Sequence, residues 1–221
     1  MSLKLIKPIW ESKFGKKGFI DFMGKERKIR LLDVGCGNGS PFWYKMNYPD
    51  HYYVGLDILD YNQSSHAQNI ADKYIKTSPS NFAKMIENMG GEFDAVISSH
   101  NIEHCNEPER VIYAMINALK KNGMLYISTP CKESIHFPSR SGCLNFFDDA
   151  THKIPVDCDK VIELLKNSGG QILVYKKRYR PIWLALKGLI CEPYSALKKR
   201  VNDDGSTWAL WGFETIIWFK K

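Results

Sequence analysis

The sequence lacks the long apolar segment that a membrane-spanning helix needs. The longest apolar stretch near the C-terminus, residues 182–186, ends at Lys187, whereas a span needs about 18 or more consecutive apolar residues. The first eight residues contain neither an apolar core nor a small-residue cleavage site, so we expect no secretory signal. These two absences predict a cytoplasmic protein without a transmembrane segment.

Closely spaced cysteines are missing as well. No two of the six form a C-x-x-C pair, and they stand far apart in the chain: Cys36, Cys105, Cys131, Cys143, Cys158 and Cys191. This spacing supports neither a zinc knuckle nor a disulfide framework. We therefore expect six reduced thiols.

The composition is typical of one compact domain over residues 1–221. Hydrophobic residues make up 44% of the 221 positions and charged residues 25%, so a full core can form and disorder is disfavoured. Lys and Arg number 31 against 24 Asp and Glu, which gives a net charge of +7. This excess permits binding to nucleic acid, nucleotide-sugars or membrane surfaces. The basic clusters at 176–180 and 198–200 carry no RNA-recognition motif, so a nucleic-acid partner is not favoured.

Short apolar runs alternate with segments of helical periodicity. The predicted strands are residues 29–34, 52–56, 73–76, 93–98, 124–128, 171–177 and 213–219. Helices are predicted at 8–23, within an N-terminal helical segment 1–28, and at 109–120 and 158–167. This alternation predicts an α/β fold with an open, mostly parallel sheet and helices on both sides.

The most informative stretch, L-L-D-V-G-C-G-N-G at residues 31–39, is a strand that runs into a glycine turn. Glycines permit positive φ and a close approach of ligand to backbone, at the edge where open α/β sheets bind ligands. The dinucleotide fingerprint G-x-G-x-x-G is not met, because Ser40 and Pro41 follow Gly39. The next strand ends at Asp57, whose carboxylate can accept hydrogen bonds from both hydroxyls of a ribose.

Four stretches in order resemble the class I S-adenosylmethionine-dependent methyltransferases, in the branch of the ubiquinone-type and small-molecule or sugar enzymes. Residues 33–39 resemble the cofactor loop of that family, and Asp57 resembles its ribose-binding acid. F-D-A-V-I-S at 93–98 with N-I-E-H at 101–104 is similar to its fourth strand and the following turn, and residues 120–130 are similar to its fifth strand. The resemblance implies a Rossmann-like sheet with an antiparallel last strand. It also implies S-adenosylmethionine as cofactor and S-adenosylhomocysteine as product.

The resemblance places the cofactor-binding residues at the carboxyl edge of the first four strands. These residues are Asp33, Gly35, Cys36, Gly37, Asn38, Gly39, Asp57, Ile58, Ser78, Ser98, Ser99 and His100. The sequence departs from the family after the third strand, where an acid usually contacts the adenine amino group. Residues 77–81 read T-S-P-S-N instead, so we expect Ser78 or a backbone carbonyl to replace that acid.

Three histidines are candidates for chemistry on the acceptor. A hydroxyl acceptor must lose its proton, and histidine titrates near neutral pH. His100 and His104 follow the fourth strand, and His152 lies in a segment that resembles the family's D-x-T-H-x-x-P turn above the acceptor pocket. Each histidine either acts as base, orients the acceptor, or only stabilises its turn. His100, His104 and Glu103 could instead hold a metal such as Mg²⁺, which we do not favour.

The sequence is therefore interpreted as a methyltransferase acting on an oxygen of a small molecule or saccharide. Loop 131–155 is expected to form a lid, and insert 181–209 is expected to face the acceptor. The aromatic residues of this insert could bind a sugar, lie on a membrane surface, pack in the core or form a homodimer face. Two alternatives stay open: an RNA methyltransferase, suggested by the positive charge, and a non-catalytic cofactor-binding regulatory protein.

Overall fold

The computed structural model describes residues 13–24, 28–37, 39–58 and 69–221. Within these ranges one sheet of seven strands has the order β3-β2-β1-β4-β5-β7-β6. The strands are β1 (Arg30–Val34), β2 (Tyr52–Ile58), β3 (Lys73–Thr77), β4 (Phe93–Ser99), β5 (Leu119–Pro130), β6 (Gln171–Tyr179) and β7 (Glu214–Lys220). β1 to β5 pair in parallel, whereas β7 runs antiparallel to both β5 and β6. The predicted sheet, mostly parallel with an antiparallel last strand, is confirmed.

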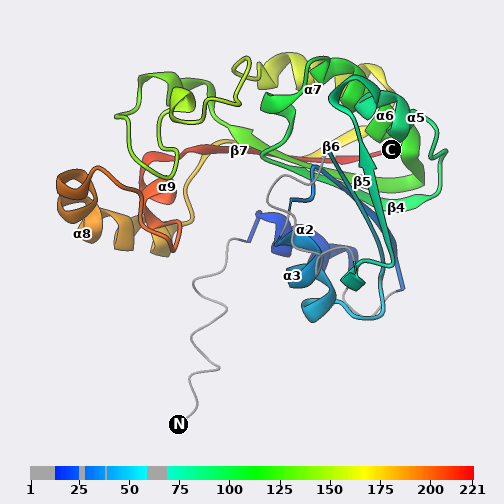
Figure 1. Cartoon of the computed structure of the whole chain (residues 1–221), viewed down its shortest axis with the longest axis horizontal. Coiled ribbons are helices and arrows are strands. Elements are labelled where there is room, and N and C mark those ends of the chain that lie inside the picture. The colour runs from blue at the N-terminus through cyan, green and yellow to red at the C-terminus, as the bar shows by residue number, and fades with distance from the viewer. Residues whose placement is uncertain (1–12, 25–27, 38, 59–68) are drawn as a thin grey trace, which may run out of the picture.

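Helices cover both faces of the sheet (Figure 1). One face carries α5 (Phe82–Glu87), α6 (Pro108–Ala118) and α7 (Cys158–Asn167), and the other carries α2 (Lys16–Gly24) and α3 (Ser40–Asn47). Apolar residues of α6 and α7 pack with β1 and β5 in one core, and those of α2 and α3 pack with β5 and β7 in a second core. The central strands are buried on both sides, which explains their near-continuous apolar sequences.

Several element boundaries differ from the prediction; β5, for example, begins at Leu119 rather than at residue 124. The helix expected at 8–23 lies partly outside the described residues, and its described part is α2. The helix expected at 109–120 ends at Ala118, because Leu119 is buried in an extended conformation and pairs with Phe93. Insert 181–209 contains α8 (Ile182–Lys198) and the start of α9 (Ser206–Trp211). No helix among the described residues is both long and apolar enough to cross a membrane.

The segment expected to form a lid packs against this insert. It contains two short 3-10 helices, Lys132–His136 and Phe146–Asp148. Cys131 and Leu144 share a small core with Val201 and Phe213. Arg140 is buried and hydrogen-bonds to Glu192 of α8. Residues 131–148 and α8 therefore form one wall at the carboxyl edge of the sheet, and the lid role of this segment stays a prediction.

Candidate cofactor and acceptor site

The glycine turn after β1 is anchored to β2 and open on its other side. The backbone amides of Gly35 and Cys36 donate to Leu56 O at 2.8 and 3.2 Å. Gly35 has φ +72°, and a Cβ there would lie 2.3 Å from Asn101 Cγ, so both conformation and space require glycine. A Cβ on Gly37 or Gly39 would meet no atom within 4 Å. Among the described residues the turn thus leaves room for a ligand, and its contact with cofactor stays a prediction. Asn38 lies outside the described residues.

Asp57 lies at the carboxyl end of β2, beside the open turn. Its Oδ2 accepts from the Gly37 amide at 2.6 Å and its Oδ1 from the Ile58 amide at 2.7 Å. Burial raises the pKa of this carboxyl above its usual 3.8. Each carboxylate oxygen can accept a further hydrogen bond, so Asp57 fits the expected role of ribose acceptor.

The buried carboxylate of Asp33 is held by side chains from α2, α3 and β2. Its Oδ2 accepts from Tyr53 Oη at 2.8 Å and from Ser40 Oγ at 2.5 Å, and Lys16 Nζ lies 3.3 Å away. Its buried Oδ1 has no hydrogen-bond partner among the described residues, and such an oxygen suits an ammonium group such as that of the methionine part of the cofactor. Cys36 is also buried, which raises the pKa of its thiol, so this side chain packs as a neutral group.

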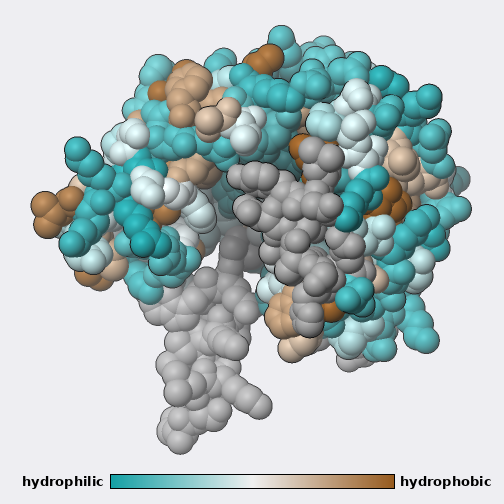
Figure 2. Space-filling view, in the orientation of Figure 1, coloured by the Kyte–Doolittle hydropathy of each residue, from teal (hydrophilic) through white to brown (hydrophobic). Residues whose placement is uncertain are grey.

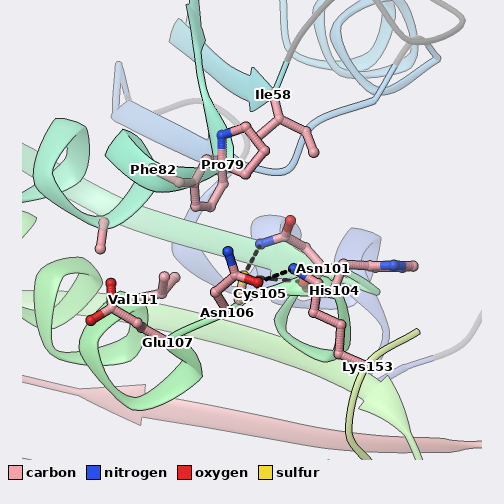
Figure 3. A pocket seen from close by; sticks show the side chains of 11 residues that line it. Ile58, Pro79, Phe82, Asn101, His104, Cys105, Asn106, Glu107, Val111 and Lys153 are labelled. Atoms are coloured by element: carbon pink, nitrogen blue, oxygen red, sulfur yellow. Dashed lines mark hydrogen bonds between the residues drawn. The ribbon is translucent and has the colours of Figure 1, made fainter. Parts of the chain in front are cut away.

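A cavity of about 140 Å³ is lined by Ile58, the residue that follows Asp57 in the chain (Figure 3). Figure 3 shows Ile58, Pro79 and Phe82 on one side of it and Asn101 and Cys105 on the other. The apolar side formed by Ile58, Pro79 and Phe82 suits the face of a flat base such as adenine. The residues that line this cavity do not include Ser78, whose hydroxyl instead hydrogen-bonds to Ser80 Oγ at 3.0 Å. The expected replacement of the family's acid by the Ser78 side chain is therefore not supported.

Sequence analysis did not select Pro79, Phe82 and Asn101 as site residues. The sequence signal for the first two was their position directly after the third predicted strand, at the edge where ligands bind. Ser98 and Ser99, which sequence analysis did select, make hydrogen bonds to neighbouring residues at the end of β4. Asn101 Nδ2 donates to Ser98 Oγ at 3.3 Å, and the hydroxyls of Ser99 and Ser128 lie 3.0 Å apart. Their contact with cofactor stays a prediction.

His100 lies between two carboxylates. Its Nε2 is 2.6 Å from Glu214 Oε1 and its Nδ1 is 3.4 Å from Glu103 Oε1. Burial lowers the pKa of His100, but the two carboxylates outweigh this effect and raise the pKa to about 10. His100 is therefore an imidazolium at neutral pH and has no free lone pair. This geometry argues against His100 as the base that sequence analysis considered.

His104 has the opposite arrangement. Its Nδ1 lies 2.9 Å from Thr151 Oγ1, and that hydroxyl donates its only proton to Asp149 Oδ1 at 2.6 Å. The Thr151 oxygen must therefore accept from His104, which places the proton of a neutral ring on Nδ1. The lone pair of His104 Nε2 is then available. The D-x-T-H-x-x-P resemblance had indicated this turn but not its contact with His104.

His152 is fixed by its own turn. Its Nδ1 donates to Phe146 O at 2.5 Å, and its ring centroid lies 4.7 Å from that of His104. Because a carbonyl can only accept, the Nδ1 of His152 carries a proton. The fold thus brings together His104 and His152, which are far apart in the sequence.

A second and larger cavity of about 640 Å³ lies on the other side of His104. Aromatic and apolar surfaces come from Tyr179, Leu184, Trp208 and Phe213. Polar groups come from the three histidines together with Asp149 and Glu214. A volume between about 300 and 1,000 Å³ suits a small organic molecule. His104 lines both cavities, so it lies where they meet.

One group of described residues could hold a metal ion. Glu103, His104 and His152 have ligand atoms within 4.8 Å of one another. The set differs from the expected one, because His152 replaces His100, which is paired with Glu214. Two nitrogen ligands and one carboxylate do not match the oxygen ligands that Mg²⁺ prefers.

Comparison with known proteins agrees with this geometry. The model of a methyltransferase domain family matches residues 15–181. The mitochondrial ubiquinone biosynthesis O-methyltransferase of Bos taurus is 27% identical over 114 residues, which cover 49% of this chain and 30% of that protein. A tRNA U34 carboxymethyltransferase of Pseudomonas fluorescens is 31% identical over 103 residues, or 45% of this chain and 32% of that protein. These matches span less than a third of each relative's own length.

Solved structures give the same fold. The crystal structure of a SAM dependent methyltransferase from Archaeoglobus fulgidus has a TM-score of 0.57 and 19% identity, and the match covers 100% of this chain and 95% of that one. The open glycine turn, the free acceptor capacity of Asp57 and the apolar cavity beside it fit S-adenosylmethionine, the cofactor of this family. The chain therefore belongs to the class I S-adenosylmethionine-dependent methyltransferases.

Proposed function

We propose that this protein transfers a methyl group from S-adenosylmethionine to an oxygen of a small molecule or saccharide. The observation that carries the proposal is the position of His104 between the two cavities. The smaller cavity adjoins the ribose-binding carboxylate, and the larger one has the size and lining of an acceptor site. A group at their junction is next to the place where donor and acceptor would meet.

His104 is the proposed base. The cofactor, when bound, supplies a methyl group already activated by its positively charged sulfur. The protein then has to align the acceptor oxygen and take up its proton. The hydrogen bonds from His104 to Thr151 and from Thr151 to Asp149 hold the ring with the Nε2 lone pair free. The hydroxyl proton of the acceptor would move to this atom.

His100 and His152 have positioning roles in this proposal. The imidazolium of His100 and the carboxylate of Glu214 lie in the wall of the larger cavity, where they can hydrogen-bond to polar groups of the acceptor. His152 packs against His104 and limits its motion. The aromatic surfaces of Trp208 and Phe213 suit the face of a sugar or phenol ring.

The experiment is a methyl-transfer assay with a panel of phenols, catechols and saccharides. With an accepted substrate, His104→Gln should lower kcat by about 10²- to 10⁴-fold, as expected for loss of a general base. The affinity for S-adenosylhomocysteine should change little, and His136→Gln, in a 3-10 helix outside both cavities, is the matched control. Full turnover by His104→Gln would refute the proposed role.

The same assay separates the alternatives. The tRNA-modifying relative and the net charge of +7 motivate including tRNA and rRNA in the panel. Methylation of RNA, with binding that weakens steeply as salt rises, would replace the small-molecule proposal. Cofactor binding without turnover on any acceptor would favour a regulatory protein.

A further inference from the structure

The outward face of α8 carries only apolar residues. Its members recur at intervals of three and four positions, which places them along one side of the helix. They are Ile182, Leu186, Leu189, Ile190, Pro193 and Leu197. Ile190 is 81% exposed and Leu197 80% exposed. Figure 2 shows strongly hydrophobic residues at the same outer edge of the molecule where Figure 1 places α8.

The inner face of α8 fixes this orientation. A Cβ on Gly188 would lie 2.3 Å from Ser206 O and 2.8 Å from Leu210 Cβ, so α8 and α9 are packed closely at this point. Ser195 is buried, donates to Arg200 O and accepts from Arg140. Small and polar residues thus hold the inner side, and a rotation that buried the large apolar residues would break these contacts.

Aromatic and basic residues border the apolar face. Trp183 and Tyr194 lie about three turns apart on one edge, and each is followed one turn later by a lysine, Lys187 and Lys198. Aromatic rings with a polar edge prefer the boundary between hydrocarbon and water, and lysines prefer the anionic surface outside it. This order, from apolar centre through aromatic edge to lysine, is typical of a helix that lies in a membrane interface.

The charges near α8 favour an anionic surface. The acidic side chains of the insert are already paired, because Glu192 binds Arg140, Asp203 binds Arg200 and Asp204 binds Lys187. In contrast, Lys198 and Lys199 are exposed, and no carboxylate is paired with either within the described residues. The basic cluster before the helix, residues 176–180, contributes less, because Lys177 is paired with Asp159 and Arg178 donates to Trp211 O. The C-terminal end of α8 therefore carries the positive charge that would attract anionic lipids.

We propose that α8 binds the surface of an anionic lipid bilayer, with its apolar face inserted among the acyl chains. Pro181 and Leu184, at the start of this helix, also line the larger cavity. If that cavity is the acceptor site, a consequence that rests on the proposed function, docking brings its lining next to the bilayer. The acceptor class would then be an amphiphile that carries a hydroxyl.

The test is flotation with vesicles of phosphatidylcholine containing phosphatidylglycerol, compared with pure phosphatidylcholine and without cofactor or acceptor. We expect the anionic vesicles to bind the protein more tightly. Ile190→Glu combined with Leu197→Glu should weaken binding at least about tenfold, because two apolar side chains that insert among the acyl chains in this proposal become charged. Replacing Lys198 and Lys199 by alanine should weaken binding to anionic vesicles by about fivefold per charge. Met46→Glu, on the exposed side of α3, is the matched control and should bind like wild type.

A second readout covers the case in which the double variant is unstable. Lipids brominated in the acyl chain should quench the fluorescence of Trp183, and the Trp183→Phe variant should lose that part of the quenching. Absence of wild-type binding to anionic vesicles, or equal binding by the glutamate variant, overturns the proposal. A dimer in light scattering that the glutamate variant dissociates, without vesicle binding, would assign the face to a second copy of the chain instead. Because flotation needs no turnover, its failure is distinct from failure of the proposed methyl transfer.

Discussion

Three histidines near the carboxyl edge of the sheet differ in what their ring nitrogens contact. His100 faces two carboxylates that keep it charged. His104 donates to a hydroxyl from Nδ1, and no hydrogen bond to its Nε2 comes from the described part of the chain. His152 donates to a backbone carbonyl. The same residue type thus has three different chemical capacities. Neighbours contributed by other strands and turns decide between them.

At this scale, replacing Asp57 by alanine should weaken S-adenosylhomocysteine binding at least about tenfold, because hydrogen bonds to a charged acceptor are lost. Asp57→Asn should lose less affinity for S-adenosylhomocysteine, since its amide oxygen still accepts a hydrogen bond.

Burial raises the pKa of Asp57, so wild-type affinity should fall on acidification through a pH above the usual 3.8. Calorimetric titration measures both effects. Asp159→Ala, at an exposed position of α7, is the control. Unchanged affinity of Asp57→Ala would mean that another residue binds the ribose.

The charge of His100 gives a pH-dependent prediction. Its folded-state pKa is about 10 against an ordinary 6.5, so its ion pairs stabilise the fold fully below about pH 6.5 and lose that effect as pH rises to about 10. His100→Asn should therefore lower Tm most at pH 6 and least at pH 10. Asparagine suits the positive φ of 50° at this position, so backbone strain does not confound the comparison. An equal loss of Tm at both pH values would contradict the assignment.

At the scale of elements, the glycine turn and the wall formed by residues 131–148 and α8 shape the site by different means. The turn depends on backbone conformation at Gly35 and Gly37. The wall depends on side chains, above all Arg140, which joins its two segments. Each of these two features can be tested with one substitution and a control substitution at a nearby residue of the same type.

Gly35→Ala should destabilise the protein by about 1–3 kcal/mol or more, because the new Cβ would meet Asn101 and the residue has a positive φ. Gly39→Ala is the control, since its φ is −87° and a Cβ there meets no atom within 4 Å. Urea unfolding of both variants measures the difference. Similar stabilities would mean that the turn can rearrange without cost.

Arg140→Ala should destabilise the protein by about 2 kcal/mol, because Glu192 and Ser195 lose a charged, buried donor. Limited proteolysis should also cut the insert 181–209 faster. Arg200→Ala removes an exposed pair with Asp203 and should cost about 0.5 kcal/mol or less. If both variants unfold at the wild-type temperature, Arg140 does not hold the wall together.

At the scale of the whole molecule, both cavities are formed by several elements of the folded chain. Cofactor binding is therefore linked to stability, because the unfolded chain has no such site. A ligand at 100 times its Kd stabilises the fold by about 2.7 kcal/mol. S-adenosylhomocysteine should therefore raise Tm in wild type and much less in Asp57→Ala. EDTA should not change the shift, because protein atoms of Asp57, Pro79 and Phe82 make the expected contacts. A shift abolished by EDTA would show that a metal supports the cofactor site.

The sequence by itself determined the strands of the sheet and the glycine turn, whereas the antiparallel direction of the last strand was implied only by the family resemblance. These features depend on local patterns: apolar runs for strands, glycine where φ is positive, and an acid at a strand end. The same patterns placed Asp57 next to the turn. They could not place α8, because its apolar face points outward and so does not mark a buried side.

Only the tertiary structure decided which groups each histidine contacts and where the larger cavity lies. Glu214 lies 114 positions after His100, and Thr151 lies 47 after His104, so no local pattern predicts either contact. Pro79 and Phe82 were not selected for a similar reason, because the cavity that they line also takes residues from the turn after β4 and from α6, which are distant in the sequence. Local propensity sets the elements, but burial and ionisation depend on neighbours that only folding brings into contact.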